Sequence, residues 1–389
     1  MKPSRLHFLF DKKLTSLSKS LFVCIIKELS ILSFMQKTIN TIIPPKKRNH
    51  FISYIKGYSI IAVLLIHMID WSNVAIGPIS NWFKELLYPG VFFFMATSGS
   101  VVYIAYAKSE TWIKPAKKLF WRGLQLVGIY YLYNIIKLFI YDFSKEPFYW
   151  QFTNNGKMTW QNILELKAYS APISILLTIG VMIMFSPILL FISKKIKFPN
   201  LFISGLVTVL LYAVYGHIWN GPVADFLFAR NNIMFPIATW SIPFLAGYLL
   251  ASFGFEEKKQ WWLTIFVLLM TIFLYLQIKN ELDLKPSNSM YPLQPYYMVA
   301  SLFFVSILFY LFSWSEKLSF SLLKKKLAVI RFLGDYTLSV YIWHWIVVDS
   351  TIWIFYPNTK MIWFTVPFFL IIFIIIKRAK FKEYLLNQV

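Results

Sequence analysis

Two ionisable side chains share the first long apolar segment of the chain, YIKGYSIIAVLLIHMIDW, which covers residues 54–71. Lys56 lies near its start, and His67 follows eleven residues later, about 16 Å further along a helix. Ionisable groups inside such segments are costly and mark functional sites by default. The long stem of Lys56 also allows its ammonium to reach the membrane interface, a simpler reading that stays open.

Asp70 follows His67 by three residues, so the two side chains share one helical face. A carboxylate beside an imidazole can fix its tautomer and raise its basicity, as in the base–orienter pairs of enzymes. This spacing suits a pair in which Asp70 orients the imidazole of His67, although a position of His67 near the outer membrane interface is the alternative. An ordinary exposed acid at the end of a helix is the alternative for Asp70.

Polar and small residues interrupt three further apolar segments. Arg122 and Gln125 are three residues apart in KKLFWRGLQLVGIYY, and the fork geometry of a guanidinium suits a phosphate. Arg122 is equally compatible with a positively charged membrane boundary. Ser98 lies among the small residues of PGVFFFMATSGSVVY, which allow either close helix packing or approach of a ligand.

His344 lies between Trp343 and Trp345 in LGDYTLSVYIWHWIVVD. We expect it at a depth comparable to that of His67, although a buried packing histidine is the alternative. The five histidines show no HxxH or HExxH spacing, and Cys24 is the single cysteine. A metal site and an internal disulfide framework are therefore not expected.

Composition sets the class of protein. Hydrophobic residues make up 58% of the 389 residues and charged residues only 14%, against about half and a quarter in soluble domains. The sequence therefore predicts an all-α polytopic integral membrane protein whose main partner is the lipid bilayer. A net charge of +22 would suggest nucleic acid in a soluble protein, but here we expect no such partner.

Ten segments have roughly the 20 mostly apolar residues that a membrane-spanning helix needs. They are residues 52–70, 87–107, 119–141, 169–193, 200–217, 233–253, 261–278, 296–314, 334–355 and 361–376. With a cytoplasmic N-terminus, 29 of the 39 lysines and arginines fall in cytoplasmic segments and eight in outer connections. This asymmetry predicts that both termini are cytoplasmic.

The predicted organisation has three parts. Residues 1–50 form a basic cytoplasmic or interfacial extension, and Met35 is an alternative start within it. Residues 51–378 form the transmembrane domain, and residues 379–389 form a basic cytoplasmic tail. We expect a multi-pass protein of the cell inner or plasma membrane.

Four motifs in this order resemble the membrane-bound acyltransferase 3 family, whose known members include glycan O-acyltransferases. Lys56 and His67 are similar to its basic-x10-His motif, and Gly90-Val91 with Ser98-Gly99 to its second-span pattern. The remaining two motifs are FWRGLQLVGIYY around Arg122 and LGDYTLSVYIWHWIV around His344. The resemblance covers roughly residues 50–378, and its late part also fits the related heparan-alpha-glucosaminide N-acetyltransferase-like group.

The resemblance implies an acyl-CoA-dependent O-acetyltransferase, with acetyl-CoA as the expected donor and no metal. An acyl group would pass from cytoplasmic acyl-CoA to a hydroxyl of an envelope or surface glycan, or of a lipid-linked sugar. His67 would be the general base or a transient acyl carrier, with Asp70 as orienter. The donor would be held by Lys56, Arg122 and Gln125, and the acceptor would lie near Ser98, Trp343 and His344.

Three positions depart from the family pattern. Lys56 stands where arginine is usual, Ser53 where an acid often precedes it, and Gln125 where a second arginine is found. Arginine and lysine are not equivalent at a bidentate site. A transporter or flippase for a lipid-linked glycan and a homologue that has lost catalysis are therefore kept as alternatives.

Overall fold

The computed structural model describes residues 50–72, 78–109, 111–140, 160–164, 173–215, 235–253, 297–298, 300–305, 307–308, 321–355, 358–377 and 381. The chain divides into the units Met1–Asn49 and His50–Val389, and every described residue belongs to the second. The predicted span 261–278 and nearly all of the predicted extension 1–50 lie outside the described residues.

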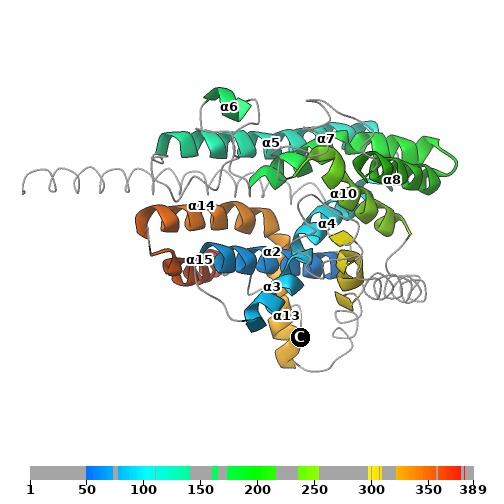
Figure 1. The fold of residues 1–389 in the computed structure, drawn as a ribbon. Helices are drawn as coiled ribbons and strands as arrows, with labels where there is room; N and C mark the ends of the chain where they lie inside the picture. The colour runs from blue at the N-terminus through cyan, green and yellow to red at the C-terminus, as the bar shows by residue number, and fades with distance from the viewer. Residues whose placement is uncertain are drawn as a thin grey trace, which may run out of the picture. The chain divides into compact units, whose positions relative to one another are not determined.

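All regular structure in the described residues is helical, with no strand among them (Figure 1). The long helices are α2 (His50–Trp71), α4 (Pro89–Tyr106), α5 (Ile113–Ile140), α7 (Ser174–Lys195), α8 (Pro199–Tyr215), α10 (Ile237–Ser252), α13 (Ser321–Asp335), α14 (Thr337–Phe355) and α15 (Ile362–Ile376). Short helices are α3 (Pro78–Leu87), α6 (Trp160–Leu164) and the 3-10 turn η4 (Thr359–Met361).

Four helical stretches in the described part of the chain are long and apolar enough to cross a membrane. They are Phe51–Trp71, Phe83–Tyr106, Ser174–Lys195 and Thr359–Ile376. Pro199–Leu210 and Ile237–Ser252 are apolar but shorter. The described residues are therefore all helical and consistent with a membrane protein, while the full set of ten spans and the orientation of the termini stay predictions.

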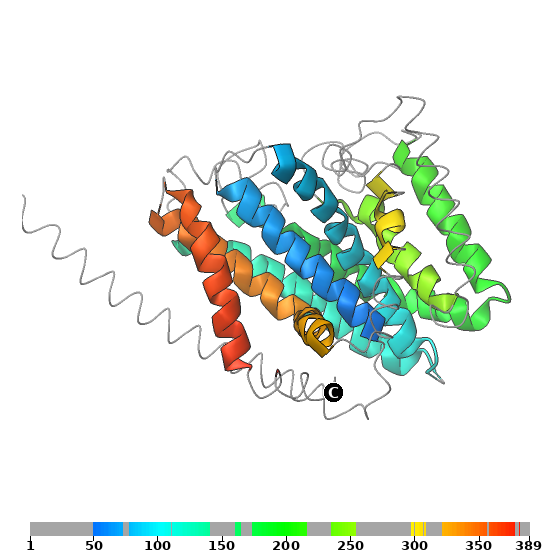
Figure 2. The ribbon, with the colours of Figure 1, turned by 90° about the horizontal axis from the view of Figure 1, so that it is seen from below.

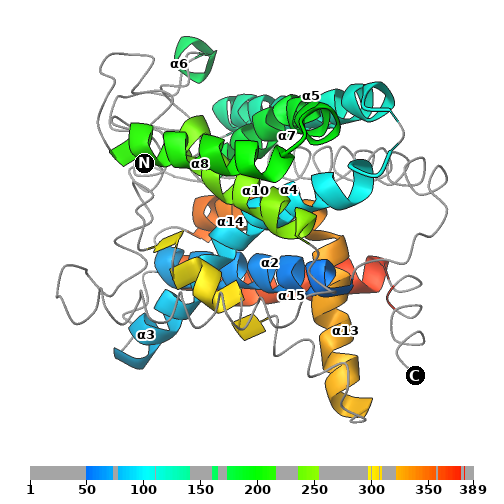
Figure 3. The same ribbon diagram turned by 90° about the vertical axis from the view of Figure 1, so that its right-hand side faces the viewer.

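Helix α13 was not expected as a separate element, because residues 315–333 read as a basic connection before a span at 334–355. The chain instead turns at Tyr336, between the end of α13 and the start of α14. Helix α13 packs across α2 at a steep angle (Figures 1 and 3). Glycines make this crossing close, since a Cβ at Gly57 would meet the Ile330 carbonyl and one at Gly334 the Ser53 carbonyl.

The elements that carry the site pack in three groups. Helices α2, α14 and α15 contact one another and lie side by side in Figure 2. Helix α4 packs closely on α10, where Gly99 meets the Phe244 carbonyl and Gly247 meets the backbone of Ala96. Helix α5 packs closely on α7 through Gly123 and Gly180. Small residues allow such close backbone approach between membrane helices.

Candidate active site

The imidazoles of His67 on α2 and His344 on α14 stack on each other. Their ring centroids are 5.6 Å apart and their planes differ by 12°. The indole of Trp345 lies 4.3 Å from the His67 ring, and Trp71 meets that ring edge-on at 6.1 Å. Two histidines distant in sequence thus share one aromatic enclosure.

Hydrogen bonding fixes the tautomer of neutral His344. Its Nδ1 lies 3.3 Å from the Val340 carbonyl, which can only accept, so Nδ1 carries the proton. The lone pair is then on Nε2, which is buried without a hydrogen-bond partner among the described residues. Because a buried polar atom is normally paired, this acceptor is available for a hydrogen-bond donor from a substrate.

His67 is more accessible than its partner. Its side chain is half-buried, whereas His344 is fully buried at 0% exposure. The Nδ1 atom of His67 has no hydrogen-bond partner within the described part of the chain. Of the two rings, His67 is therefore the one with more accessible surface.

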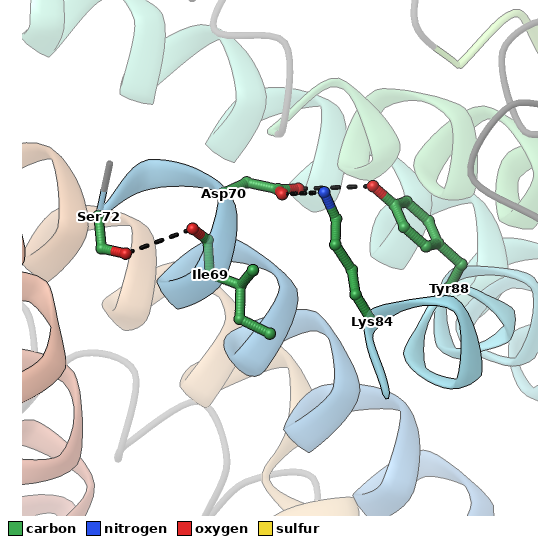
Figure 4. A network of polar contacts seen from close by, with 5 residues as sticks. All are labelled: Ile69, Asp70, Ser72, Lys84 and Tyr88. Atoms are coloured by element: carbon green, nitrogen blue, oxygen red, sulfur yellow. Dashed lines mark hydrogen bonds and ion pairs between the residues drawn. The ribbon is translucent and has the colours of Figure 1, made fainter. Parts of the chain in front are cut away.

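The carboxylate of Asp70 contacts residues that follow α2. It forms an ion pair with Lys84 on α3 and accepts a long hydrogen bond of 3.5 Å from the Tyr88 hydroxyl (Figure 4). These contacts tie the end of α2 to the segment leading into α4. The orienting role of Asp70 toward His67 stays a prediction.

A charged cluster surrounds Lys56 near the other end of α2. Ser53 donates a 2.6 Å hydrogen bond to Asp335, the last residue of α13. The charge of Asp335 acts favourably on the Lys56 ammonium, and that of Arg122 acts unfavourably. The close crossing of α2 and α13 brings Asp335 to this position. Ser53 stands where the family pattern often has an acid, and the acid beside it comes instead from α13.

Arg122 projects from α5 toward the end of α4. Its Nη1 donates a 3.2 Å hydrogen bond to the Tyr106 hydroxyl. The ammonium of Lys118, one turn earlier on α5, lies 6.0 Å from the centre of the Tyr106 ring. Partial burial lowers the pKa of Lys118, and the neighbouring Arg122 guanidinium lowers it further. Gln125 is exposed, and its predicted contact with the donor stays a prediction.

The predicted acceptor residues lie on two helices, Ser98 on α4 and Trp343 and His344 on α14. Ser98 is half-buried and donates a 2.9 Å hydrogen bond to the Phe94 carbonyl within α4. Trp345, with 1% exposure, packs on His67, while Trp343 is half-buried. Helical periodicity could have pointed to Trp345, because it lies four residues after Tyr341 and shares its helical face. The Tyr341 ring in turn lies 5.2 Å from that of His344. The roles proposed for Ser98 and Trp343 stay predictions.

Sequence reasoning gave no role to a buried ion pair between α5 and α14. The Lys137 ammonium lies 2.8 Å from Oδ2 of Asp349, and their side chains are 2% and 0% exposed. The Tyr133 hydroxyl also donates to this oxygen. The sequence could have indicated this pair, because Lys137 and Asp349 are charged residues inside two apolar segments, and a charge buried in a membrane protein is usually paired.

The fold and the site define the class: a helical membrane protein whose helices α2 and α14 carry a histidine pair, with Lys56 near the other end of α2. Residues 49–376 match the family of the acyltransferase domain, acyltransferase 3, which is most of the 389-residue chain. The protein therefore belongs to the acyltransferase 3 family and is a membrane acyltransferase. No curated protein matches the chain.

Proposed function

We propose that the protein transfers an acyl group, with acetyl as the expected one, from cytoplasmic acyl-CoA to a hydroxyl of an envelope or surface glycan. The observation that carries this proposal is the placement of two different sites on one helix. Lys56 lies within the electrostatic influence of Asp335 and Arg122, and His67 lies in the aromatic enclosure about 16 Å further along α2. The extended pantetheine arm of coenzyme A has a comparable length.

The side chains of Lys56 and Arg122 suit the phosphate groups of the donor. Guanidinium and ammonium groups bind phosphate through charge-assisted hydrogen bonds. Arg122 is held by the Tyr106 hydroxyl, and Lys56 lies beside Asp335. A donor bound there by its phosphates would extend its thioester toward His67.

The histidine pair supplies the base that the chemistry needs. A sugar hydroxyl is a weak nucleophile near neutral pH, and a positioned general base contributes about 10²–10⁴-fold to the rate. His67 takes the hydroxyl proton while the oxygen attacks the thioester carbonyl. The carbon–sulfur bond then breaks, and the proton on His67 passes to the departing thiolate, so that the ester and free coenzyme A are formed.

Replacement of His67 by alanine tests this mechanism. Membranes containing the variant should transfer label from acetyl-CoA to glycan at least about a hundredfold more slowly than wild type. His50→Ala removes a histidine from the other end of α2 and serves as the matched control. Unchanged transfer in the His67 variant would refute the role of the imidazole.

Binding of coenzyme A separates this function from transport of a lipid-linked glycan. A ligand that binds only the folded protein raises its thermal midpoint in proportion to the logarithm of its concentration. An acyltransferase in detergent should therefore be stabilised by coenzyme A. A glycan transporter gives no reason for such a response.

A further inference from the structure

Two cations converge on one aromatic ring where α4 and α5 meet. Lys118 and Arg122 are four residues apart on α5, so they share a face. The Arg122 guanidinium lies 3.2 Å from the Tyr106 hydroxyl, and the Lys118 ammonium lies 6.0 Å from the centre of the same ring. Both cationic side chains are half-buried.

Tyr106 is a firm anchor for this arrangement. It is the last residue of α4, is 8% exposed, and packs in a hydrophobic cluster with Val102, Leu119 and Tyr248. Its ring face attracts the ammonium, and its hydroxyl oxygen accepts from the guanidinium. The two charges are thus held near each other by a residue that neutralises neither.

The charges of this pair are not balanced within the described residues. Neither Lys118 nor Arg122 forms an ion pair with a carboxylate in that part of the chain. Like charges one turn apart on a helix repel each other, and partial burial strengthens the repulsion. An anion bound between Lys118 and Arg122 would remove the repulsion.

We propose that Lys118 and Arg122, arranged around Tyr106, form a two-cation site for a phosphate group, and that Lys118 is a phosphate-binding residue. The proposal rests on the proposed function in one respect, since it identifies the phosphate as one carried by the acyl-CoA donor. Gln125, three residues after Arg122, is exposed and carries no charge. The second cation of this site is therefore Lys118, one turn before Arg122.

The test compares Lys118→Met with Lys117→Met in the full-length protein in detergent. Lys117 is the adjacent, exposed lysine, so both variants lose one charge from the same turn. The measurement is the concentration of pyrophosphate, and separately of coenzyme A, that gives half-maximal thermal stabilisation. Lys118→Met should raise both concentrations about tenfold, the effect of one charge-assisted hydrogen bond. Lys117→Met should leave them near the wild-type values.

Lys118→Arg keeps the charge and should bind both ligands, which guards against an effect on folding alone. Pantetheine has no phosphate, so the concentration of pantetheine that gives half-maximal thermal stabilisation should be the same for all variants. Equal concentrations for Lys118→Met and Lys117→Met, or no stabilisation of wild type by pyrophosphate, would overturn the proposal. Stabilisation by pyrophosphate that depends on Lys118, without any by coenzyme A, would support the phosphate site and instead refute the proposed donor.

Discussion

The imidazole of His344 lies against that of His67 with only 12° between their planes, although 277 positions separate the two residues in the chain. Stacked rings cannot hydrogen-bond to each other through their in-plane nitrogen atoms. Each ring therefore keeps its nitrogen atoms for other partners.

His344→Phe tests whether the second imidazole takes part in the reaction. Phenylalanine keeps an aromatic ring against His67 but removes the Nε2 lone pair. We expect acyl transfer to fall at least about tenfold, since a hydrogen bond to a reacting group is typically worth that much or more. The measurement is transfer of label from acetyl-CoA, with thermal unfolding as the control for folding. Wild-type activity would make His344 a packing residue.

The buried pair of Lys137 and Asp349 should be sensitive to loss of one partner. Lys137→Ala leaves the Asp349 carboxylate buried beside Tyr133 without its cation, which typically costs about 3–5 kcal/mol. The double variant Lys137→Met with Asp349→Leu replaces both charges by apolar groups and should recover most of that loss. Thermal unfolding of the three proteins in detergent measures the difference. Equal stability of the single and double variants would contradict the role of the ion pair.

Close helix packing makes some glycines irreplaceable and others not. A Cβ at Gly247 would collide with the backbone of Ala96, whereas one at Gly128 meets nothing within 4 Å. Gly247→Ala should therefore lower the thermal midpoint and the yield of folded protein. Gly128→Ala should be neutral or stabilising by about 0.5–1 kcal/mol, because alanine favours a helix interior. Loss of folding in the Gly128 variant alone would contradict this packing.

Asp335 should act on donor binding through Lys56. Asp335→Asn removes the charge that offsets the Lys56 ammonium and weakens the hydrogen bond from Ser53. We expect a lower stability by about 0.5–1.5 kcal/mol, because the charge-assisted hydrogen bond from the Ser53 hydroxyl becomes a neutral one. A swap, Ser53→Asp with Asp335→Ser, keeps a carboxylate between α2 and α13 and should restore stability. Thermal unfolding and the KM for acetyl-CoA distinguish the variants.

If the swap behaves like Asp335→Asn, the position of the carboxylate on α13 is itself required. If Asp335→Asn matches wild type in stability and in KM, the contact with Lys56 has no role in holding the lysine. Ser53→Ala provides a milder comparison, because it removes the hydroxyl donor but leaves the carboxylate and its charge.

The sequence by itself determined the class and the positions along each helix. An apolar content of 58% requires helices that satisfy their own backbone in lipid, and the described residues are helical. The interval from Lys56 to His67 follows from helix geometry alone. Apolar runs also located the long apolar helices, with α5 beginning earlier than predicted, at Ile113, whereas α13 was not expected.

Only the tertiary structure decided which side chains meet. Helical periodicity places a residue on a face, but the neighbour of that face depends on how closely two backbones approach and at what angle. The close crossing at Gly57 and Gly334 brought Asp335 to Ser53. Packing of α14 against α2 placed Trp345, rather than Trp343, on His67.

The charged residues show the same division most clearly. Lys118, Lys137 and Asp349 could be read from the sequence as charges at the edge of an apolar segment or within one. Lys137 and Asp349 pair between helices that are distant in the chain, and Lys118 contacts Tyr106 on the preceding helix, while no spacing rule relates one helix to another. Because a charge in a low-dielectric interior is stabilised by a specific neighbour, its function depends on a contact that only the folded chain creates.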